Sequence, residues 1–266
     1  MDVHLKNHVR IVGHPEGRPV MLAHGFGCDQ NLWRLVVPLL ADRFRLVLFD
    51  HVGAGASEPS AWDGDRYADL QQYADDILDI VDELALRDAV FVGHSVASMM
   101  GVLAAATRPD AFAGLVLLTP SPRYLDDRDY RGGFSRDDID ELLDSIESNY
   151  LGWSRVMAPV IMGTPERPEL EDELGDAFCR TDPARALTFA RTTFLSDNRP
   201  DLSRVTVPTV IVECAHDTLA PREVGAYCHT HIRGSTLVTL DATGHCPHLS
   251  APDATAAAIT DFADQL

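Results

Sequence analysis

The sequence has little positive charge and no long apolar run. Its 22 Lys and Arg residues stand against 41 Asp and Glu, which gives a formal net charge of -19. Such an acidic surface repels phosphate backbones and anionic lipid headgroups. We therefore expect neither a nucleic acid nor a membrane as partner. No apolar stretch reaches the roughly 18 residues of a membrane span, and the first residues lack a basic region followed by an apolar core. We expect a cytoplasmic protein that acts on a neutral or apolar small molecule.

Paired cysteines are also missing. The five cysteines are scattered without a CxxC pair, which indicates reduced thiols. Cys28 and Cys246 neighbour catalytic candidates, but an isolated cysteine is most often a small buried apolar side chain. His245 and His248 have the spacing of a ligand pair, yet neither a HExxH helix nor a cysteine cluster completes a metal site. We therefore expect no metal, and we expect His248 to be a structural hydrogen-bonding residue.

Residues 90–101 predict a strand, a sharp turn and a helix, with a serine at the turn. Residues 90–92 are β-branched or aromatic, and an Ala-rich run follows Ser95. In a nucleophile elbow the residues two before and two after the serine must be small, or strand and helix would collide. Here these are Gly93 and Ala97, where glycine is usual at both positions. An ordinary turn with a capping serine fits the same string, so both interpretations stay open on this motif alone.

Strand and helix patterns alternate through the first 120 residues. Residues 67–84 carry apolar side chains every three to four positions, as a helix with one buried face does. This alternation predicts a mainly parallel sheet with helices on both faces. Residues 3–12 alternate polar and apolar side chains before a turn, which predicts an opening β-hairpin. Further buried strands are predicted at 19–23, 45–49, 90–92, 115–118, 208–214 and 236–240, and a terminal helix at 253–266.

Residues 123–195 contain no convincing strand pattern. Their apolar residues recur at helical spacing, and glycine and proline breakers separate the segments. We expect an insertion of about four helices that lies as a lid over the carboxyl edge of the sheet. One domain results, with a core formed by residues 1–122 and 196–266 and the lid at 123–195.

Three chemically matched groups follow three different strands. Ser95, Asp217 and His245 stand in the chain order nucleophile, acid, base, and each lies just beyond a predicted strand. His245 would take the serine proton and return it to the leaving alcohol, while Asp217 would fix the imidazole tautomer. Asp241 competes with Asp217 for the acid role but comes only four residues before His245, which makes it the weaker choice.

The glycine-rich loop at 24–29 is the expected second half of an oxyanion hole. The backbone N–H groups of Phe26 and Val96 would stabilise the developing alkoxide. A plain turn is the alternative, while a phosphate loop is disfavoured because no Gly-Lys-Ser/Thr follows. His24, His51 and His94 lie at the same predicted strand ends. We expect each of them to be packed in the interior or hydrogen-bonded to backbone.

The chain resembles the α/β-hydrolase branch that includes the bacterial stress-signalling hydrolase RsbQ and the plant strigolactone and karrikin receptors. The similar segments run nearly end to end and include HGFGCDQ at 24–30, FDHVGAGAS at 49–57, FVGHSV at 91–96, NYLGW at 149–153 and GHCPHLSAP at 244–252. The last two look closer to the bacterial members, which indicates an RsbQ-like protein. The resemblance implies an α/β-hydrolase fold with a mainly parallel, eight-stranded sheet and a V-shaped lid of four helices.

The resemblance also implies a function. It points to hydrolysis of a small, mostly apolar ester or butenolide-type lactone through an acyl-enzyme, with no cofactor. The alternative is a ligand-sensing signalling protein with slow hydrolysis and a protein partner, because the bacterial relative acts with a partner phosphatase. The implied pocket residues are Phe26, Tyr124, Phe134, Leu142, Trp153, Met157, Leu174, Phe194 and Leu219.

Overall fold

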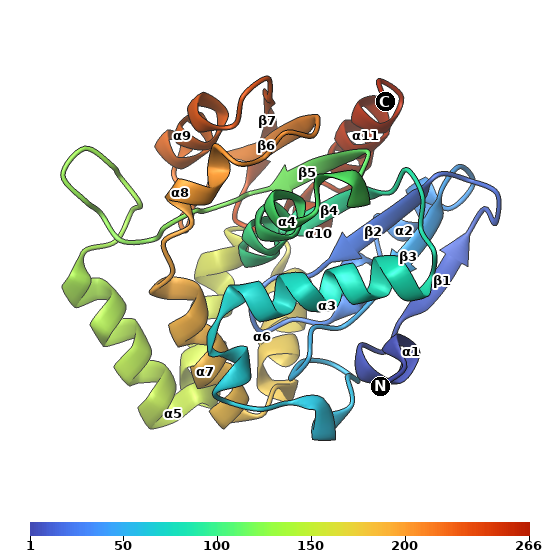
Figure 1. Ribbon diagram of the computed structural model, residues 1–266. Coiled ribbons are helices and arrows are strands. Elements are labelled where there is room, and N and C mark those ends of the chain that lie inside the picture. The colour runs from blue at the N-terminus through green and yellow to red at the C-terminus, as the bar shows by residue number, and fades with distance from the viewer.

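A single seven-stranded sheet runs through the protein (Figure 1). The computed structural model describes all residues from 1 to 266. The strands are β1 (Arg10–Gly13), β2 (Pro19–Ala23), β3 (Arg45–Leu48), β4 (Val90–His94), β5 (Gly114–Leu118), β6 (Thr209–His216) and β7 (Thr236–Thr243). Their order is β1-β3-β2-β4-β5-β6-β7, and only the β1–β3 pair is antiparallel. The prediction of a mainly parallel sheet is confirmed.

The predicted opening hairpin and eighth strand are wrong. Residues 3–6 form a short helix instead, α1 (Val3–Lys6), which the Asp2 side chain caps by accepting a backbone hydrogen bond. Lys6 Nζ lies 2.7 Å from Asp76 Oδ1, and Val3 is buried in the core. These contacts with a distant part of the chain favour a helix where the local alternation favoured a strand, because tertiary packing overrides weak local preferences.

Side chains on the strands alternate between two cores. On β4, Phe91 packs in one cluster with α3 (Leu70–Glu83) and α4 (Val96–Thr107), whereas Val90 and Val92 pack in another with α11 (Pro252–Ala263). Alternation follows from the two-residue period of a strand. Because both faces are covered, β4 is buried at every position, which is why residues 90–92 are all large and apolar.

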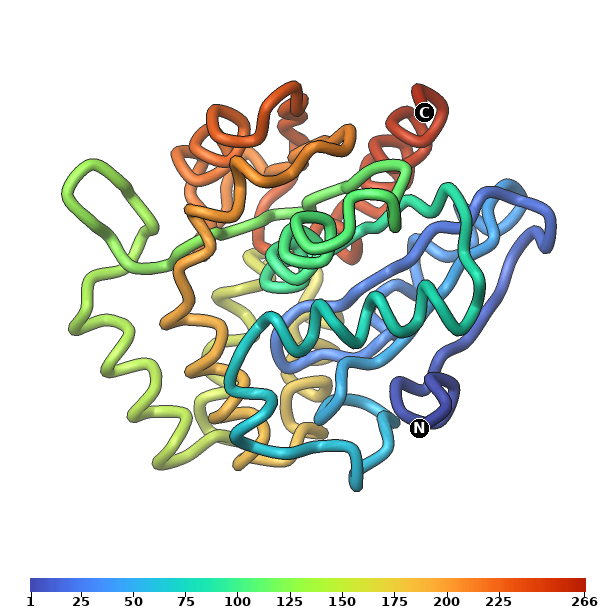
Figure 2. Tube along the Cα trace, viewed as in Figure 1, coloured from blue at the N-terminus to red at the C-terminus, as the bar shows by residue number.

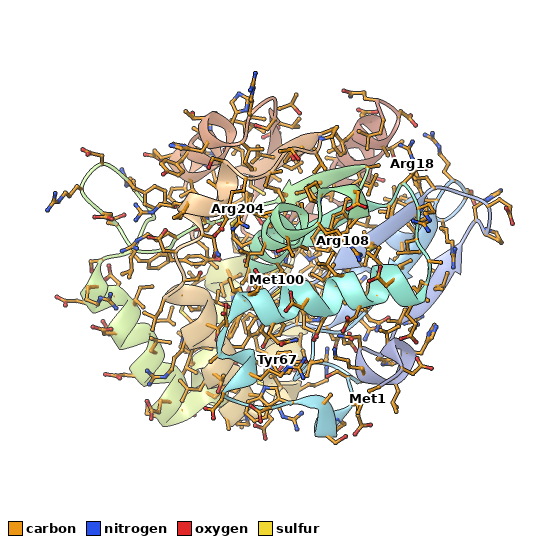
Figure 3. The ribbon with its side chains drawn as sticks, viewed as in Figure 1. Met1, Arg18, Tyr67, Met100, Arg108 and Arg204 are labelled. Atoms are coloured by element: carbon orange, nitrogen blue, oxygen red, sulfur yellow. The ribbon has the colours of Figure 1, made fainter.

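Helices α3 and α4 lie side by side in front of the sheet in Figure 1. The Asp69 side chain caps α3 by accepting from the backbone N–H of Gln71. At the end of α4, Arg108 Nη1 donates to Asp82 Oδ1 at 2.7 Å, and Figure 3 shows Arg108 and Met100 along this boundary. The two helices thereby close the face of the sheet that carries Phe91.

The chain between β5 and β6 is helical. It forms α5 (Arg136–Met162), α6 (Pro168–Arg180) and α7 (Pro183–Phe194), and Figure 2 shows it leaving the sheet and returning to it. Asn149 has φ -157 and ψ 73, so α5 bends there into two arms, 136–148 and 150–162. Four helical segments therefore occupy this stretch, the number expected.

The remaining helices are shorter than α3, α5 and α6. They are α2 (Val37–Leu40), α8 (Arg199–Leu202), α9 (Arg222–His231) and α10 (Pro247–Ser250). No helix is both long and apolar enough to cross a membrane. Apolar residues of α5, α6 and α7 form a third cluster with Cys28, Leu219 and Cys246, which follow β2, β6 and β7. The helical stretch thus covers the carboxyl ends of the strands.

Candidate active site

Ser95 lies in a strained turn between β4 and α4. Its backbone has φ 57 and ψ -125, a conformation that L-residues rarely adopt. A Cβ on Gly93 would lie 2.6 Å from the backbone C and O of Ala97, so only glycine fits at position 93. Ala97 supplies backbone to this close approach, while its side chain is buried in the core. The turn therefore accommodates alanine at position 97, where glycine is usual.

A chain of hydrogen bonds joins Ser95, His245 and Asp217. Ser95 Oγ lies 2.7 Å from His245 Nε2, and His245 Nδ1 lies 2.8 Å from Asp217 Oδ2. Because a carboxylate only accepts, the ring proton is on Nδ1 and Nε2 is free to accept from the serine. Asp217 Oδ1 accepts from the N–H groups of Leu219 (2.8 Å) and Ala220 (3.1 Å), which fixes its carboxylate.

The three side chains come from loops after β4, β6 and β7, as the chain order predicts. The side chains of His245 and Asp217 are 3 % and 1 % exposed, so their hydrogen bond is shielded from water. Asp241, the rival acid, is an exposed residue of β7 and makes no hydrogen bond to His245. The arrangement is able to move a proton from a serine hydroxyl to an imidazole.

The backbone of His245 is fixed on both sides. Its N–H donates to the carbonyl of Ile161 at the end of α5, at 2.8 Å. Its carbonyl accepts from His94 Nε2 (2.8 Å) and from Thr119 Oγ1 (3.2 Å). Gly244 precedes it with φ +86, and a Cβ there would collide with the same end of α5. The position of His245 therefore depends on the helical stretch as well as on the sheet.

The glycine loop after β2 lies against Ser95. A Cβ on Gly25 would lie 2.7 Å from His94 Nδ1 and 3.2 Å from Ser95 Cβ, so glycine lets the loop come this close without moving either residue. The Phe26 N–H donates no hydrogen bond within the protein. Val96 is the first residue of α4, where helix N–H groups lack an intrahelical partner. Both predicted oxyanion donors are thus unpaired N–H groups beside the serine loop.

Three histidines near the site bond to backbone, as expected. His24 Nδ1 donates to the Gly25 carbonyl at 2.9 Å, and His51 Nε2 donates to the His24 carbonyl at 2.9 Å. His94 Nε2 bonds the His245 carbonyl. Burial lowers the pKa of all three rings below the ordinary histidine value, so they are neutral near pH 7.

The expectation for His248 is wrong. Neither of its ring nitrogens has a hydrogen-bond partner in the protein. The ring packs against Trp33 and His94, with centroids 4.8 and 4.3 Å away, and aromatic faces offer it no acceptor. Burial lowers its pKa to about 3. One ligand-type atom from each of His94, Cys246 and His248 lies within 4.8 Å of the others, a grouping of distant residues that the sequence pattern did not indicate.

The cysteines are unpaired, as predicted. Cys28 and Cys246 are buried near the serine, and burial raises the pKa of both thiols above the usual value. A protonated thiol is a poor nucleophile, since the thiolate is the reactive form. Both side chains therefore act as apolar wall.

A small apolar chamber adjoins Ser95 and His245. Its free volume is about 30 Å³, and twelve of its sixteen lining residues are hydrophobic. Eight predicted pocket residues line it: Phe26, Tyr124, Leu142, Trp153, Met157, Leu174, Phe194 and Leu219. Sequence reasoning missed Ile161, Phe178 and Thr193, although Ile161 and Phe178 lie one helical turn beyond the predicted Met157 and Leu174.

A larger vestibule of about 660 Å³ lies between the two arms of α5. Phe134, the ninth predicted residue, lines this vestibule and not the chamber. Leu142, Trp153 and Met157 line both spaces and form the neck between them. A ligand that entered through the vestibule would have to pass these three side chains to reach Ser95.

The chain is similar to known proteins over nearly its whole length. The chain is 41% identical over 245 residues to a strigolactone esterase of Arabidopsis thaliana, covering 92% of this chain and 91% of the relative. It is 40% identical over 248 residues to a karrikin insensitive 2 receptor of Petunia hybrida, covering 93% and 90%. A solved structure of a hydrolase from Oleispira antarctica superposes with a TM-score of 0.96 at 39% identity, covering 100% of this chain and 97% of that one.

Membership follows from the extent of these matches together with the strand, turn and helix around Ser95. The sequence profile described as the alpha/beta hydrolase family matches residues 20–258. The chain belongs to the alpha/beta hydrolase family.

Proposed function

We propose that the protein is a serine hydrolase that cleaves a small, mostly apolar ester or butenolide-type lactone. One observation carries the proposal: the hydrogen-bond chain from Ser95 through His245 to Asp217 opens onto an apolar chamber. A relative 41% identical is named a strigolactone esterase, which supports an ester or lactone as the substrate class.

The reaction has two halves. Ser95 Oγ attacks the carbonyl carbon as its proton passes to His245 Nε2, 2.7 Å away. The tetrahedral oxyanion accepts hydrogen bonds from the N–H groups of Phe26 and Val96. On collapse, His245 returns the proton to the leaving oxygen, and the acyl group stays on Ser95. Water then attacks the acyl-enzyme, with His245 again accepting the proton and giving it to Ser95 Oγ.

The size of the chamber limits the reacting part of the substrate. The chamber's free volume of about 30 Å³ is far smaller than that of the vestibule, so an acyl group or ring that enters it must be compact or must displace side chains of the neck. The vestibule of about 660 Å³ has room for a larger leaving group. We infer a substrate with a compact ester or lactone head and a bulkier remainder that stays in the vestibule.

The helical stretch at 123–195 is then a lid inserted into one domain, whose core is formed by residues 1–122 and 196–266. Its side chains complete the chamber: Leu142, Trp153 and Met157 come from α5, and Leu174 comes from α6. A lid of this kind excludes bulk solvent from the site, while leaving room for the one water that attacks the acyl-enzyme, and it strengthens the electrostatic interactions at the oxyanion.

A second candidate is a ligand sensor with slow hydrolysis and a protein partner. The observation that favours it is that similar proteins are named receptors. Turnover rate and capture of a protein partner separate the two candidates: an enzyme releases product rapidly and repeatedly, whereas a sensor hydrolyses slowly and binds a partner protein when ligand is present.

The test uses Ser95→Ala beside the unaltered protein. Hydrolysis of p-nitrophenyl acetate should disappear in the variant, and a serine-directed sulfonyl fluoride should add its mass to the unaltered protein alone. A panel of short-chain esters and racemic butenolides then ranks substrates. Undiminished hydrolysis by Ser95→Ala would exclude the proposed nucleophile.

A further inference from the structure

Resting on the proposed hydrolysis at Ser95, we propose that His51 is a positioning residue for the oxyanion hole. The inferred role is to hold the two peptide groups His24–Gly25 and Gly25–Phe26, the second of which contains the Phe26 N–H. His51 lies in the loop after β3, and its ring does not line the inner chamber. The inference concerns how the donor is aimed, not a contact with substrate.

His51 and His24 hold each other through two reciprocal hydrogen bonds. The backbone N–H of His51 donates to His24 Nε2 at 3.1 Å, and His51 Nε2 donates to the carbonyl of His24 at 2.9 Å. The remaining ring nitrogen of His24, Nδ1, donates to the carbonyl of Gly25 at 2.9 Å. Each bond fixes one tautomer, since a carbonyl only accepts and a backbone N–H only donates.

These bonds fix the direction of the Phe26 N–H. The carbonyl of Gly25 and the N–H of Phe26 belong to one planar peptide group and point in opposite directions. Anchoring the Gly25 carbonyl through His24 Nδ1 therefore aims the Phe26 N–H. The preceding peptide group is anchored in the same way, because His51 Nε2 holds the His24 carbonyl. Glycine, the residue at position 25, has the fewest steric limits on its backbone of all residue types, so without these anchors both peptide planes would turn more easily.

The surroundings of His51 make the anchor rigid. Its ring packs against Phe49, Tyr73 and Phe189, with centroids 5.5, 5.8 and 6.3 Å away, and the residue is 2 % exposed. The neighbouring Asp50 ties the same two loops together, since its Oδ1 accepts from the N–H of Gln30. Burial lowers the pKa of His51 well below the ordinary value, so the ring stays neutral and keeps one donor.

The experiment compares His51→Gln with His51→Asn. A glutamine side chain places its amide nitrogen near the position of His51 Nε2 and retains the donor, whereas asparagine is one carbon too short. We expect His51→Asn to lower kcat for p-nitrophenyl acetate at least about tenfold with little change in KM, since losing an oxyanion donor outright costs ~100- to 1000-fold. His51→Gln should recover most of that loss.

Affinity for phenylboronic acid provides a readout besides turnover. Its tetrahedral adduct on serine places an oxygen where the oxyanion forms, so its inhibition constant should rise in His51→Asn in proportion to the loss in kcat. Ile259→Ala, a buried change on the opposite face of the sheet, is the control for general destabilisation. It should lower Tm while leaving kcat and the inhibition constant as they are.

The outcomes are separable. Equal kcat values for the Gln and Asn variants, or a loss confined to KM, would overturn the positioning role. If His51→Asn does not fold, His51→Gln must still keep kcat within about threefold of the unaltered protein, and a larger loss in that folded variant overturns the role. Failure of the proposed hydrolysis looks different, because Ser95→Ala would then retain activity.

Discussion

The Tyr124 hydroxyl lies 3.3 Å from Ser95 Oγ, inside the apolar chamber. Burial raises the pKa of Tyr124 to about 12, so the hydroxyl stays protonated in any ordinary assay. Tyr124→Phe removes this hydrogen bond and keeps the ring. A typical net hydrogen bond contributes about 0.5–1.5 kcal/mol, so kcat/KM for p-nitrophenyl acetate should change by about 2- to 12-fold. A loss beyond 100-fold would mean that the hydroxyl takes part in the chemistry.

Asp217→Asn should lower kcat by roughly 10⁴-fold, because an amide favours the wrong imidazole tautomer while leaving the geometry intact. The matched control is Asp241→Asn, an exposed carboxylate in the next strand. Steady-state hydrolysis of p-nitrophenyl acetate by both variants provides the comparison. Comparable losses in the two would contradict the assignment of Asp217.

The neck should set the preference for acyl length. Leu142→Ala enlarges the passage between vestibule and chamber, so kcat/KM for p-nitrophenyl hexanoate should rise relative to that for the acetate. Val160→Ala, an exposed change in the same helix α5, is the control. An unchanged ratio in Leu142→Ala would place the passage elsewhere.

The two small residues of the elbow, Gly93 and Ala97, should respond differently to substitution. Gly93→Ala forces a Cβ to 2.6 Å from the backbone of Ala97 and should lower the free energy of unfolding by about 1–3 kcal/mol or more. Ala97→Gly should cost only about 1 kcal/mol, the usual penalty for glycine in a helix, and should keep activity. Urea unfolding measures both. A larger loss in Ala97→Gly than in Gly93→Ala would contradict this account of the turn.

Four buried histidines predict a loss of stability in mild acid. Burial lowers the pKa of His24, His51, His94 and His248 in the folded protein, whereas in the unfolded chain each titrates near 6.5. As pH falls below about 6.5, the unfolded state binds protons that the folded state does not. Stability is therefore complete above this pH and falls by up to about 1.4 kcal/mol per pH unit for each histidine.

Unfolding free energies at pH 7.5, 6.5, 5.5 and 5.0 provide the measurement. His248→Phe removes one titrating ring that makes no hydrogen bond. The slope of its unfolding free energy against pH should therefore be smaller, by the equivalent of up to one bound proton. A free energy that does not change between pH 7.5 and 5.0 would mean that these rings are protonated in the folded state.

Much of the site was predictable because its chemistry is local. A small residue two before the serine, an acid in a loop after a strand and a histidine after the next strand are sequence features, and the parallel sheet brings such strand ends together. The resemblance to known hydrolases likewise implied residues of the chamber, although Phe134, on the loop before α5, lies in the vestibule instead. Features that a residue and its neighbours in the chain determine could therefore be predicted from the sequence.

Features that depend on contacts between distant parts of the chain could not be predicted from the sequence. The helix at residues 3–6 exists through Val3 and Lys6 packing on α3, and no alternation of nearby side chains reports that. The meeting of His94, Cys246 and His248 joins the end of β4 to residues more than 150 positions later in the chain. The lack of any partner for His248 follows from the rings around it. The narrow chamber is a property of packed volumes, which composition does not fix.

The hydrogen bond from the His245 N–H to the Ile161 carbonyl gives the lid a mechanical link to the base. If a ligand moved the end of α5 outward, His245 would lose an anchor and its distance to Ser95 would change. Reciprocally, an acyl group that displaced His245 would push on α5. This hydrogen bond therefore ties the position of the catalytic base to the end of α5, so that a displacement of either segment would lengthen it.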